Sequence, residues 1–278
     1  VETLIGAGFF VFGAVRRNED ADRLAARFGS DFSPLLFDVT DGDAIARAAH
    51  AVEAQLGGAT LFGLVNNAGM AVQGPLLHLP IEDFRRQIEV NLIGQLRVVQ
   101  AFAPLLGARA PLADRPGRIV NMSSVAGRFA APLMGAYAAS KFALEAFSDS
   151  LRRELMVYGV DVIVIEPGMI ATPIWDKAEV AGVSGFDETI YAPAARRVLN
   201  WAVEKGRAAP PAEKVAQAVL RALTAPRPPA RIPVVANWLL DYALPPLLPT
   251  RLIDWLAARR LGFFDMREKL RGGGAPEA

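Results

Sequence analysis

The chain has 278 residues, of which 52% are hydrophobic and 21% charged, and its formal net charge is +1. This composition predicts one large α/β domain, alone or with an extension. A charge so near zero, without a basic stripe, excludes nucleic acid from the expected partners. The absence of cysteine excludes disulfides, zinc–thiolate sites and a cysteine nucleophile, and it fits a cytoplasmic, reducing compartment. His50 and His78 lack metal-ligand spacing, so we expect no metal site.

Short apolar runs alternate with longer helical patterns over about the first 225 residues, which is typical of a parallel sheet built from βαβ units. The runs are rich in Val, Ile and Leu, as expected for strands that helices cover on both faces. Strands are predicted at residues 9–15, 35–37, 61–65, 118–122, 160–165 and 232–235. The sequence therefore predicts a doubly wound, three-layer α/β domain over residues 1–236.

Apolar residues at helical spacing occupy the connections between these strands. The clearest helical patterns lie at residues 45–56, 84–96 and 137–158. A proline-rich stretch at 226–233 then marks a change of character. We place a helical extension at residues 237–278 and expect it to pack on the domain.

The strongest chemical signal is the pair Tyr137 and Lys141, in the run Tyr-Ala-Ala-Ser-Lys at the start of a long helix. Side chains four positions apart share one helical face, and a lysine ammonium near a phenol lowers the phenol's pKa toward the range of acid–base catalysis. Alone, this pair is a weak pattern, because Tyr and Lys are common neighbours on helix surfaces. Its context strengthens it: strand 118–122 runs into Ser124, at the sheet edge where ligands bind in open α/β folds.

Two further polar groups accompany this pair. Strand 61–65 runs into Asn66-Asn67-Ala68-Gly69, also at a carboxyl end, for which a plain turn is the alternative interpretation. Asn91 is an amide inside a helical pattern, where a structural role is the alternative.

With these motifs in this order, the sequence resembles the short-chain dehydrogenase/reductase family over about residues 1 to 225. The resemblance rests on NNAG at 66–69, Asn91, the serine pair that ends at Ser124, YAASK at 137–141 and the Pro167-Gly168 segment. It implies a Rossmann-like fold and an NAD(P)-dependent oxidoreductase that interconverts an alcohol and a ketone or aldehyde.

The resemblance also implies a role for each matching residue. Tyr137 would be the acid or base, Lys141 would lower its pKa and hold the nicotinamide ribose, and Ser124 would polarise the substrate carbonyl. Asn91 would position a water that links Lys141 to solvent. The remaining cofactor contacts would be Asp38 and Val39 near the adenine, Asn67, Ala68 and Gly69 on the adenosine side, and Pro167, Gly168, Ile170 and Thr172 beside the nicotinamide.

The end of strand 9–15 bears on the choice of cofactor. An acidic residue there would favour NAD, whereas arginine accommodates the 2′-phosphate of NADP. Arg16 and Arg17 occupy this place, so we predict NADP, with NAD as the alternative.

The sequence departs from the family pattern at its start. Neither the first strand nor the glycine-rich turn that binds pyrophosphate precedes residues 9–15, and Gly6 and Gly8 stand where a helix ends. Because the first strand lies at the centre of a doubly wound sheet, its absence would leave the edges of two neighbouring strands unpaired or force these strands together. We therefore expect a natural chain that is longer. The alternative to an active enzyme is a binding or regulatory protein of this fold without the phosphate-binding loop.

The substrate side is expected to be apolar. Met134, Met169 and Trp175, near Ser124, predict a pocket for a lipophilic alcohol or carbonyl compound. Prolines interrupt the apolar run after residue 236 well short of the ~20 residues of a spanning helix. We expect this tail to pack on the domain or in a homodimer or homotetramer, with peripheral membrane contact through residues 237–261 as the alternative.

Overall fold

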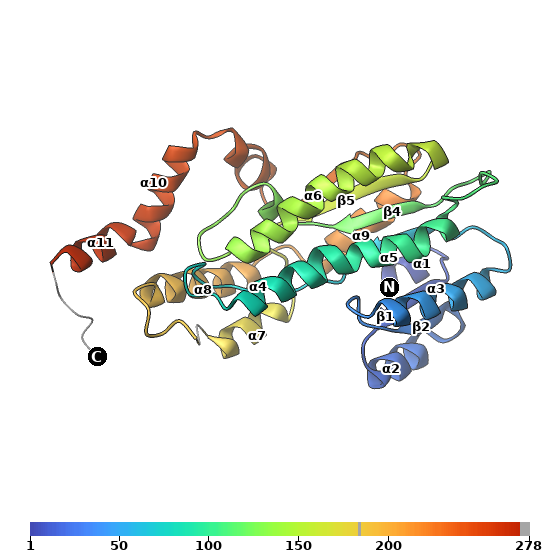
Figure 1. Ribbon diagram of the computed structural model, residues 1–278, viewed down its shortest axis with the longest axis horizontal. Coiled ribbons are helices and arrows are strands. Elements are labelled where there is room, and N and C mark those ends of the chain that lie inside the picture. The colour runs from blue at the N-terminus through green and yellow to red at the C-terminus, as the bar shows by residue number, and fades with distance from the viewer. Residues whose placement is uncertain (183–184, 273–278) are drawn as a thin grey trace.

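Parallel strands flanked by helices make up the fold in the computed structural model, which describes residues 1–182 and 185–272 (Figure 1). The strands are β1 (Val11–Val15), β2 (Phe32–Leu36), β3 (Gly63–Asn66), β4 (Arg118–Met122), β5 (Asp161–Pro167) and β6 (Arg231–Val234). The α-helices are α1 (Glu2–Gly6), α2 (Asn18–Phe28), α3 (Gly42–Leu56), α4 (Ile81–Ile88), α5 (Gly94–Phe102), α6 (Gly135–Leu155), α7 (Ile174–Ala181), α8 (Ala192–Arg207), α9 (Ala212–Thr224), α10 (Thr250–Leu261) and α11 (Phe263–Arg271). Short 3₁₀ or π segments are η1 (Gly29–Asp31), η2 (Glu89–Ile93), η3 (Ala103–Leu106), η4 (Val125–Gly127), η5 (Met156–Tyr158), η6 (Leu239–Ala243) and η7 (Pro245–Leu247).

The sheet is divided between its second and third strands in chain order. β1 pairs with β2, and β3, β4, β5 and β6 pair in that order, all in parallel. Within the described part of the chain, no ladder joins β1 to β3. Parallel strands flanked by helices confirm the predicted fold class, and the gap lies where the sequence predicts a missing strand.

Side chains, not backbone hydrogen bonds, connect the two parts of the sheet. Phe12 of β1 and Leu64 of β3 pack against the same buried cluster, which α3 and α5 supply with Ile45 and Val98. At the amino ends of the two strands, the rings of Phe9 and Phe62 lie 4.9 Å apart between centroids. Apolar packing thus holds β1 near β3 without a shared ladder.

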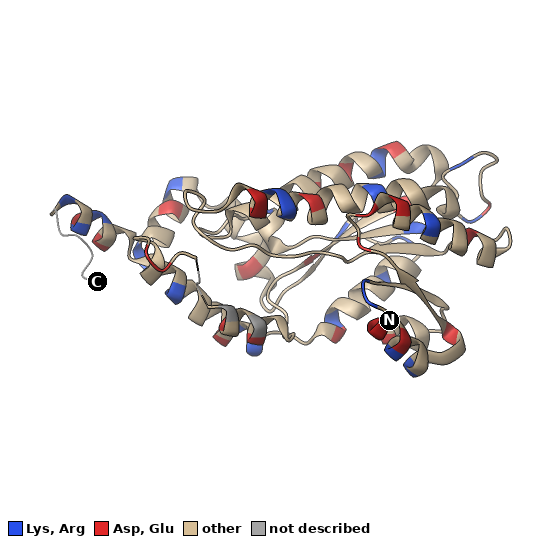
Figure 2. Cartoon of the chain, turned by 60° about the horizontal axis from the view of Figure 1, so that its bottom comes forward, with Lys and Arg blue, Asp and Glu red and all other residues tan. Residues whose placement is uncertain are grey.

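The core of the larger part lies on both faces of β4 and β5. Successive residues of a strand point to opposite faces, and neighbouring Ile119 and Val120 enter two different buried clusters. One face packs against α5 and α6 through Val99 and Leu151, and the other packs against α9 through Ala222. Charged residues occur mainly in the helices and loops, and few of them lie in the strands (Figure 2). This arrangement gives the three layers that the sequence predicts.

The carboxyl-terminal segment extends to the end of the molecule opposite β1 and β2 (Figure 1). Helix α10 lies in the stretch where the sequence predicts a helical extension, and it contacts α8. From η6, the Tyr242 hydroxyl donates a hydrogen bond of 2.7 Å to Glu166 of β5. Among the described residues, no helix combines the length and the apolar character needed to cross a membrane.

Candidate active site

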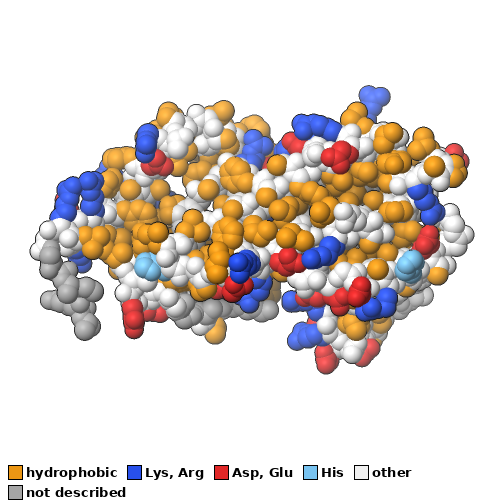
Figure 3. Space-filling view, in the orientation of Figure 1, with side chains coloured by type: hydrophobic (Ala, Val, Ile, Leu, Met, Phe, Trp, Pro, Cys, Tyr) orange, Lys and Arg blue, Asp and Glu red, His pale blue; other side chains and the backbone are white. Residues whose placement is uncertain are grey.

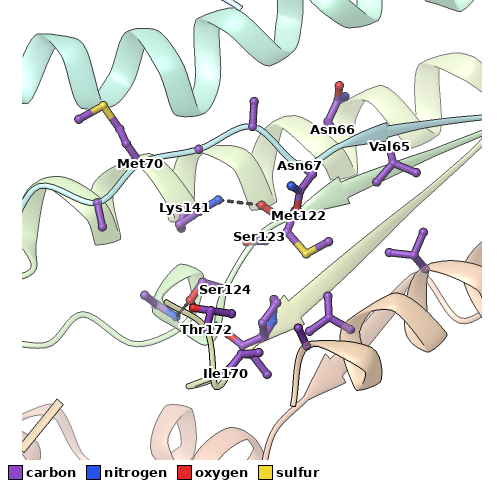
Figure 4. A pocket seen from close by; sticks show the side chains of 18 of the residues that line it. Val65, Asn66, Asn67, Met70, Met122, Ser123, Ser124, Lys141, Ile170 and Thr172 are labelled. Atoms are coloured by element: carbon purple, nitrogen blue, oxygen red, sulfur yellow. Dashed lines mark hydrogen bonds between the residues drawn. The ribbon is translucent and has the colours of Figure 1, made fainter. Parts of the chain in front are cut away.

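A large apolar cavity lies at the carboxyl ends of β3, β4 and β5 and continues into the gap beside β1 (Figure 4). Its volume is about 1900 Å³. It brings together most of the site residues that the sequence predicts: Val39, Asn67, Ala68, Gly69, Ser124, Met134, Tyr137, Lys141, Pro167, Gly168, Met169, Ile170, Thr172 and Trp175. Arg16, Arg17, Asp38 and Asn91 are predicted site residues that do not line it.

Helix α6 carries Tyr137 and Lys141 on its first turns, facing the end of β4. The Lys141 ammonium donates a hydrogen bond of 2.7 Å to the carbonyl oxygen of Met122, the last residue of β4 (Figure 4). The Lys141 Nζ lies 5.7 Å from the centroid of the Tyr137 ring. Lys141 is buried and Tyr137 is half-buried at the cavity wall. The predicted placement of the two on one helical face is therefore observed.

The protonation of this pair differs from the simple expectation. Burial lowers the pKa of Lys141 to about 8, against the opposing charge of Glu145. Burial raises the pKa of the Tyr137 hydroxyl, and a hydrogen bond with Ser124 acts in the opposite direction. Burial thus sets the net direction of the Tyr137 pKa, opposite to the lowering expected from Lys141.

Ser124 joins the end of β4 to the segment that follows β5. Its Oγ accepts a hydrogen bond from the Ala126 amide at 3.1 Å, at the start of η4, and donates to the Pro167 carbonyl at 3.3 Å. Ser124, Ile170 and Thr172 lie close together on one side of the pocket (Figure 4). The hydroxyl is therefore held at the cavity wall by contacts from two strand ends.

Asn91 and Gln87 hold the loop that follows β3. Asn91 lies in the π-helical segment η2; its Oδ1 accepts from the Met70 amide at 2.9 Å and its Nδ2 donates to the Ser140 hydroxyl at 3.0 Å. Gln87 accepts from the Val72 amide at 2.6 Å and donates to the Met70 carbonyl at 2.8 Å. Asn91 thus contacts this loop and α6, and it has no direct bond to Lys141.

Gln87 and Ser140 are site-supporting residues that sequence reasoning missed. The available signal was the spacing of Gln87 and Asn91, two amides four positions apart in an otherwise amphipathic helix.

Sequence reasoning also missed a buried chain of hydrogen bonds. Asn66 donates to Asn121 at 2.9 Å, and Asn121 donates to Ser148 at 2.9 Å. It ties β3 and β4 to α6 just below the site.

The predicted adenosine contacts lie at the carboxyl ends of β1 and β2. Arg16 forms an ion pair with Asp38 at 3.8 Å, while Arg17 donates to Asp20 at 3.0 Å. The amide and hydroxyl of Thr40 both donate to Asp38, and with Arg16 they hold the pKa of that carboxyl below its usual range. Both arginines are mostly exposed, so their charges face solvent beside the cleft.

The hydrogen-bond donors at the site suit the nicotinamide riboside of a dinucleotide better than they suit its pyrophosphate. Tyr137, Lys141 and Thr172 offer hydroxyl and ammonium groups on the apolar wall where a nicotinamide riboside would lie. For the pyrophosphate, the described residues offer no glycine-rich turn that opens a helix: α2 begins after Arg17 without a side-chain cap. The residues present therefore fit the nicotinamide end. Within residues 1–182 and 185–272, no cluster of His, Cys, Asp and Glu could hold a metal ion.

Comparison with known proteins agrees with this geometry. A family model described as short chain dehydrogenase matches residues 1–181. The NADPH-dependent 3-dehydrocapnine reductase of Ornithobacterium rhinotracheale is 39% identical over 253 residues, which cover 91% of this chain and 89% of that protein. Retinol dehydrogenase 5 of Mus musculus is 34% identical over 273 residues, covering 91% and 82%.

Solved structures give the same result. A short chain dehydrogenase/reductase from Burkholderia phymatum, in complex with NAD, superposes with a TM-score of 0.70 at 26% identity, covering 87% of each chain. A short-chain dehydrogenase from Streptomyces avermitilis superposes with a TM-score of 0.69 at 25% identity, covering 98% of this chain and 92% of that one. The chain belongs to the short-chain dehydrogenase/reductase family of NAD(P)-dependent oxidoreductases.

Proposed function

We propose that this chain interconverts a lipophilic alcohol and its ketone or aldehyde, with Tyr137 as the acid and base. The observation that carries the proposal is the placement of Tyr137, Lys141 and Ser124 together on the wall of one apolar cavity. A lipophilic substrate fits Met134, Met169 and Trp175, which line the same cavity.

The cofactor, when bound, supplies the hydride, and the chain's own residues handle the substrate and the proton. In the direction of reduction, the Tyr137 hydroxyl, which its raised pKa keeps protonated at neutral pH, donates its proton to the carbonyl oxygen. The Ser124 hydroxyl donates a hydrogen bond to the same oxygen and polarises the carbonyl. Lys141, with a pKa of about 8, is largely charged at neutral pH and stabilises the phenolate that remains.

The residues that would hold the cofactor are those that the family resemblance implies, and most of them line the cavity. Tyr137 and Lys141 would bind the nicotinamide ribose, and Ile170 and Thr172 would contact the nicotinamide, beside Pro167 and Gly168. Asn67, Ala68 and Gly69 would line the adenosine side, with Asp38 and Val39 near the adenine. Asn91 would act through the loop that it holds.

NADP is the proposed cofactor in preference to NAD. Arg16 lies at the end of β1 with most of its side chain exposed and only a long ion pair to Asp38, so its guanidinium is able to meet a 2′-phosphate. The NADPH dependence stated for the Ornithobacterium relative supports this choice. Arg16→Ala should raise the KM for NADPH and leave the KM for NADH nearly unchanged.

We place the working protein in the cytoplasm, as a homodimer or homotetramer, with a peripheral membrane contact through residues 237–261 as an alternative use of its tail. Exposed Trp238, Leu239, Leu247 and Trp255 support an apolar contact there. Co-sedimentation with liposomes would detect the membrane contact, and light scattering would give the oligomeric state.

The deciding experiment is a titration of the folded chain with NADPH and NADH, followed by turnover of a panel of lipophilic ketones. We expect NADPH binding and ketone reduction, and a loss of ~10²–10⁴-fold in kcat for Tyr137→Phe. The competing function is a binding or regulatory protein of this fold. That competing function would be supported if the natural chain and Tyr137→Phe both bound the dinucleotide and neither reduced any ketone.

A further inference from the structure

The charged side chains on the cavity wall are all of one sign. Among the described residues that line the cavity, Lys141, Arg197 and Arg260 are charged, and none is Asp or Glu. Lys141 lies deep in the site and belongs to the proposed chemistry. Arg197 and Arg260 come from α8 and α10, where the carboxyl-terminal segment meets the body of the domain. The cavity therefore has a second cationic region, made by two arginines that the proposed reaction does not use.

Both arginines are held in place while keeping donors available. The Arg197 Nη1 donates to the Leu261 carbonyl at 3.2 Å, which uses one of the five N–H groups of its guanidinium. The Arg260 guanidinium lies 5.1 Å from the centroid of the Trp201 ring, a stacking contact that leaves its edge N–H groups open. Each is therefore anchored by a neutral partner.

A neighbouring arginine on α8, in contrast, has an acidic partner. Arg196 forms an ion pair with Asp187 at 3.2 Å, whereas no ion pair joins Arg197 or Arg260 to a carboxylate in the described part of the chain. The Asp265 carboxylate borders Gly262, as Arg197 does, but the two side chains do not pair. Within the described fold, therefore, no carboxylate pairs directly with either arginine, and Asp265 lies near Arg197 without bonding to it.

The helices that carry these arginines also line the cavity with apolar side chains. Val198 and Ala202 of α8, Ile253 and Leu256 of α10, and Leu240 of η6 all line the cavity. Hydrophobic side chains also cover much of the visible face in the region of α10 (Figure 3). An apolar chain seated here would lose water without losing hydrogen bonds.

We propose that the cavity binds an amphiphile with an anionic headgroup on Arg197 and Arg260 and an apolar chain that carries the carbonyl toward Tyr137. This inference rests on the proposed function and narrows its substrate class to long-chain oxo acids or hydroxy acids. Arginine suits the headgroup because its planar guanidinium makes paired, charge-assisted hydrogen bonds to an oxyanion. A neutral analogue of equal length would keep the apolar contacts and lose these bonds.

The first test is binding, which needs no turnover. Displacement of a fluorescent fatty acid by palmitate and by hexadecanol compares an anion with a neutral chain of the same length. We expect palmitate to bind about tenfold more tightly, as two partly exposed ion pairs allow. Arg197→Met/Arg260→Met should abolish this preference without changing hexadecanol binding, and Arg197→Lys/Arg260→Lys should restore part of it.

The matched control is Arg196→Met/Arg259→Met, which removes two charges from the same helices but from outside the cavity. Equal affinities of the natural chain for palmitate and hexadecanol would overturn the proposal. The proposal would also be overturned if the control variant lost as much of the palmitate preference as Arg197→Met/Arg260→Met, because this would show a general charge effect. Thermal melting of each variant verifies that it is folded.

The second test separates this inference from the proposed function. NADPH-dependent turnover is measured for 10-oxooctadecanoate and its methyl ester. We expect a higher kcat/KM for the acid, through KM, with the advantage lost in Arg197→Met/Arg260→Met. Turnover of ester and acid at equal kcat/KM would overturn the anion site and leave the proposed function standing. Arginine-dependent palmitate binding with no turnover of any ketone would keep the anion site and overturn the proposed function.

Discussion

Removal of the Tyr242 hydroxyl should destabilise the fold through Glu166. This carboxylate is 0% exposed and lies at the end of β5, immediately before the Pro167-Gly168 segment. Its strongest contact is the 2.7 Å hydrogen bond from Tyr242, while Arg128 and Arg231 lie farther away, at 3.7 and 3.9 Å. A hydrogen bond to a charged group contributes about 1.5–3 kcal/mol. Both arginines remain in Tyr242→Phe, and Arg128 loses its 2.9 Å hydrogen bond to the phenol oxygen. We expect a loss of about 2 kcal/mol in the free energy of unfolding at pH 8.

The loss should also depend on pH, with a definite sign. Burial raises the pKa of Glu166 above its ordinary value of 4.5, so the folded state binds this proton more tightly than the unfolded state does. The contribution of Glu166 to stability is therefore greatest at low pH and decreases as pH rises through that raised pKa. Tyr242 stabilises the ionised form, so its removal raises the pKa of Glu166 further. The cost of Tyr242→Phe should then be smaller at pH 5 than at pH 8.

Urea unfolding followed by circular dichroism at pH 5 and pH 8 measures both effects. Tyr158→Phe is the matched control, because the Tyr158 side chain forms no hydrogen bond among the described residues. A double-mutant cycle with Glu166→Gln isolates the pair. A loss below about 0.5 kcal/mol at pH 8, or one equal to that of Tyr158→Phe, would refute the reasoning.

Three further changes test other parts of the site. Lys141 has a folded pKa of about 8, below its ordinary 10.5, so stability should rise between those pH values; Lys141→Met should remove that rise in urea unfolding. Gln87→Leu deletes two hydrogen bonds to the loop after β3. We expect a loss of about 2 kcal/mol in the free energy of unfolding and faster hydrogen exchange at the Val72 amide. Unchanged exchange at this amide would contradict the prediction. In Gly206→Ala, the added Cβ would overlap the Trp175 indole, whose Nε1 donates to the Ile170 carbonyl at 2.7 Å. We expect a loss of about 1–3 kcal/mol in the free energy of unfolding and a shift in tryptophan emission. An unaltered emission spectrum would contradict this prediction.

The sequence predicted the strands and the grouping of the candidate site residues for a physical reason. Strands such as 118–122 are apolar, and Ser124 is polar where the strand ends, so a local pattern locates both the element and the site. The pair Tyr137 and Lys141 needs only helical spacing to lie on one face. These features depend on neighbours in the chain, which a single sequence displays.

Other features depend on contacts between distant segments. Nothing near Lys141 in the sequence indicates that its ammonium bonds to Met122, or that burial dominates the pKa of Tyr137. Likewise Gln87 meets the loop at Val72, and Tyr242 meets Glu166, only after the whole domain has folded. The contacts of Arg197 with Leu261 and of Arg260 with Trp201 also depend on distant segments, because packing of the tail brings α8 and α10 together.

The division of the sheet has a mechanical consequence for the cleft above it. A ladder of backbone hydrogen bonds fixes both the spacing and the register of neighbouring strands. That rule governs β3 to β6, which carry the proposed nicotinamide side of the cleft. Relative to these strands, the side that carries Arg16 and Asp38 is placed by apolar packing, which has no preferred direction along the strand. The proposed catalytic and adenosine-binding regions are therefore placed in two different ways, one by directional bonds and one by side-chain shape.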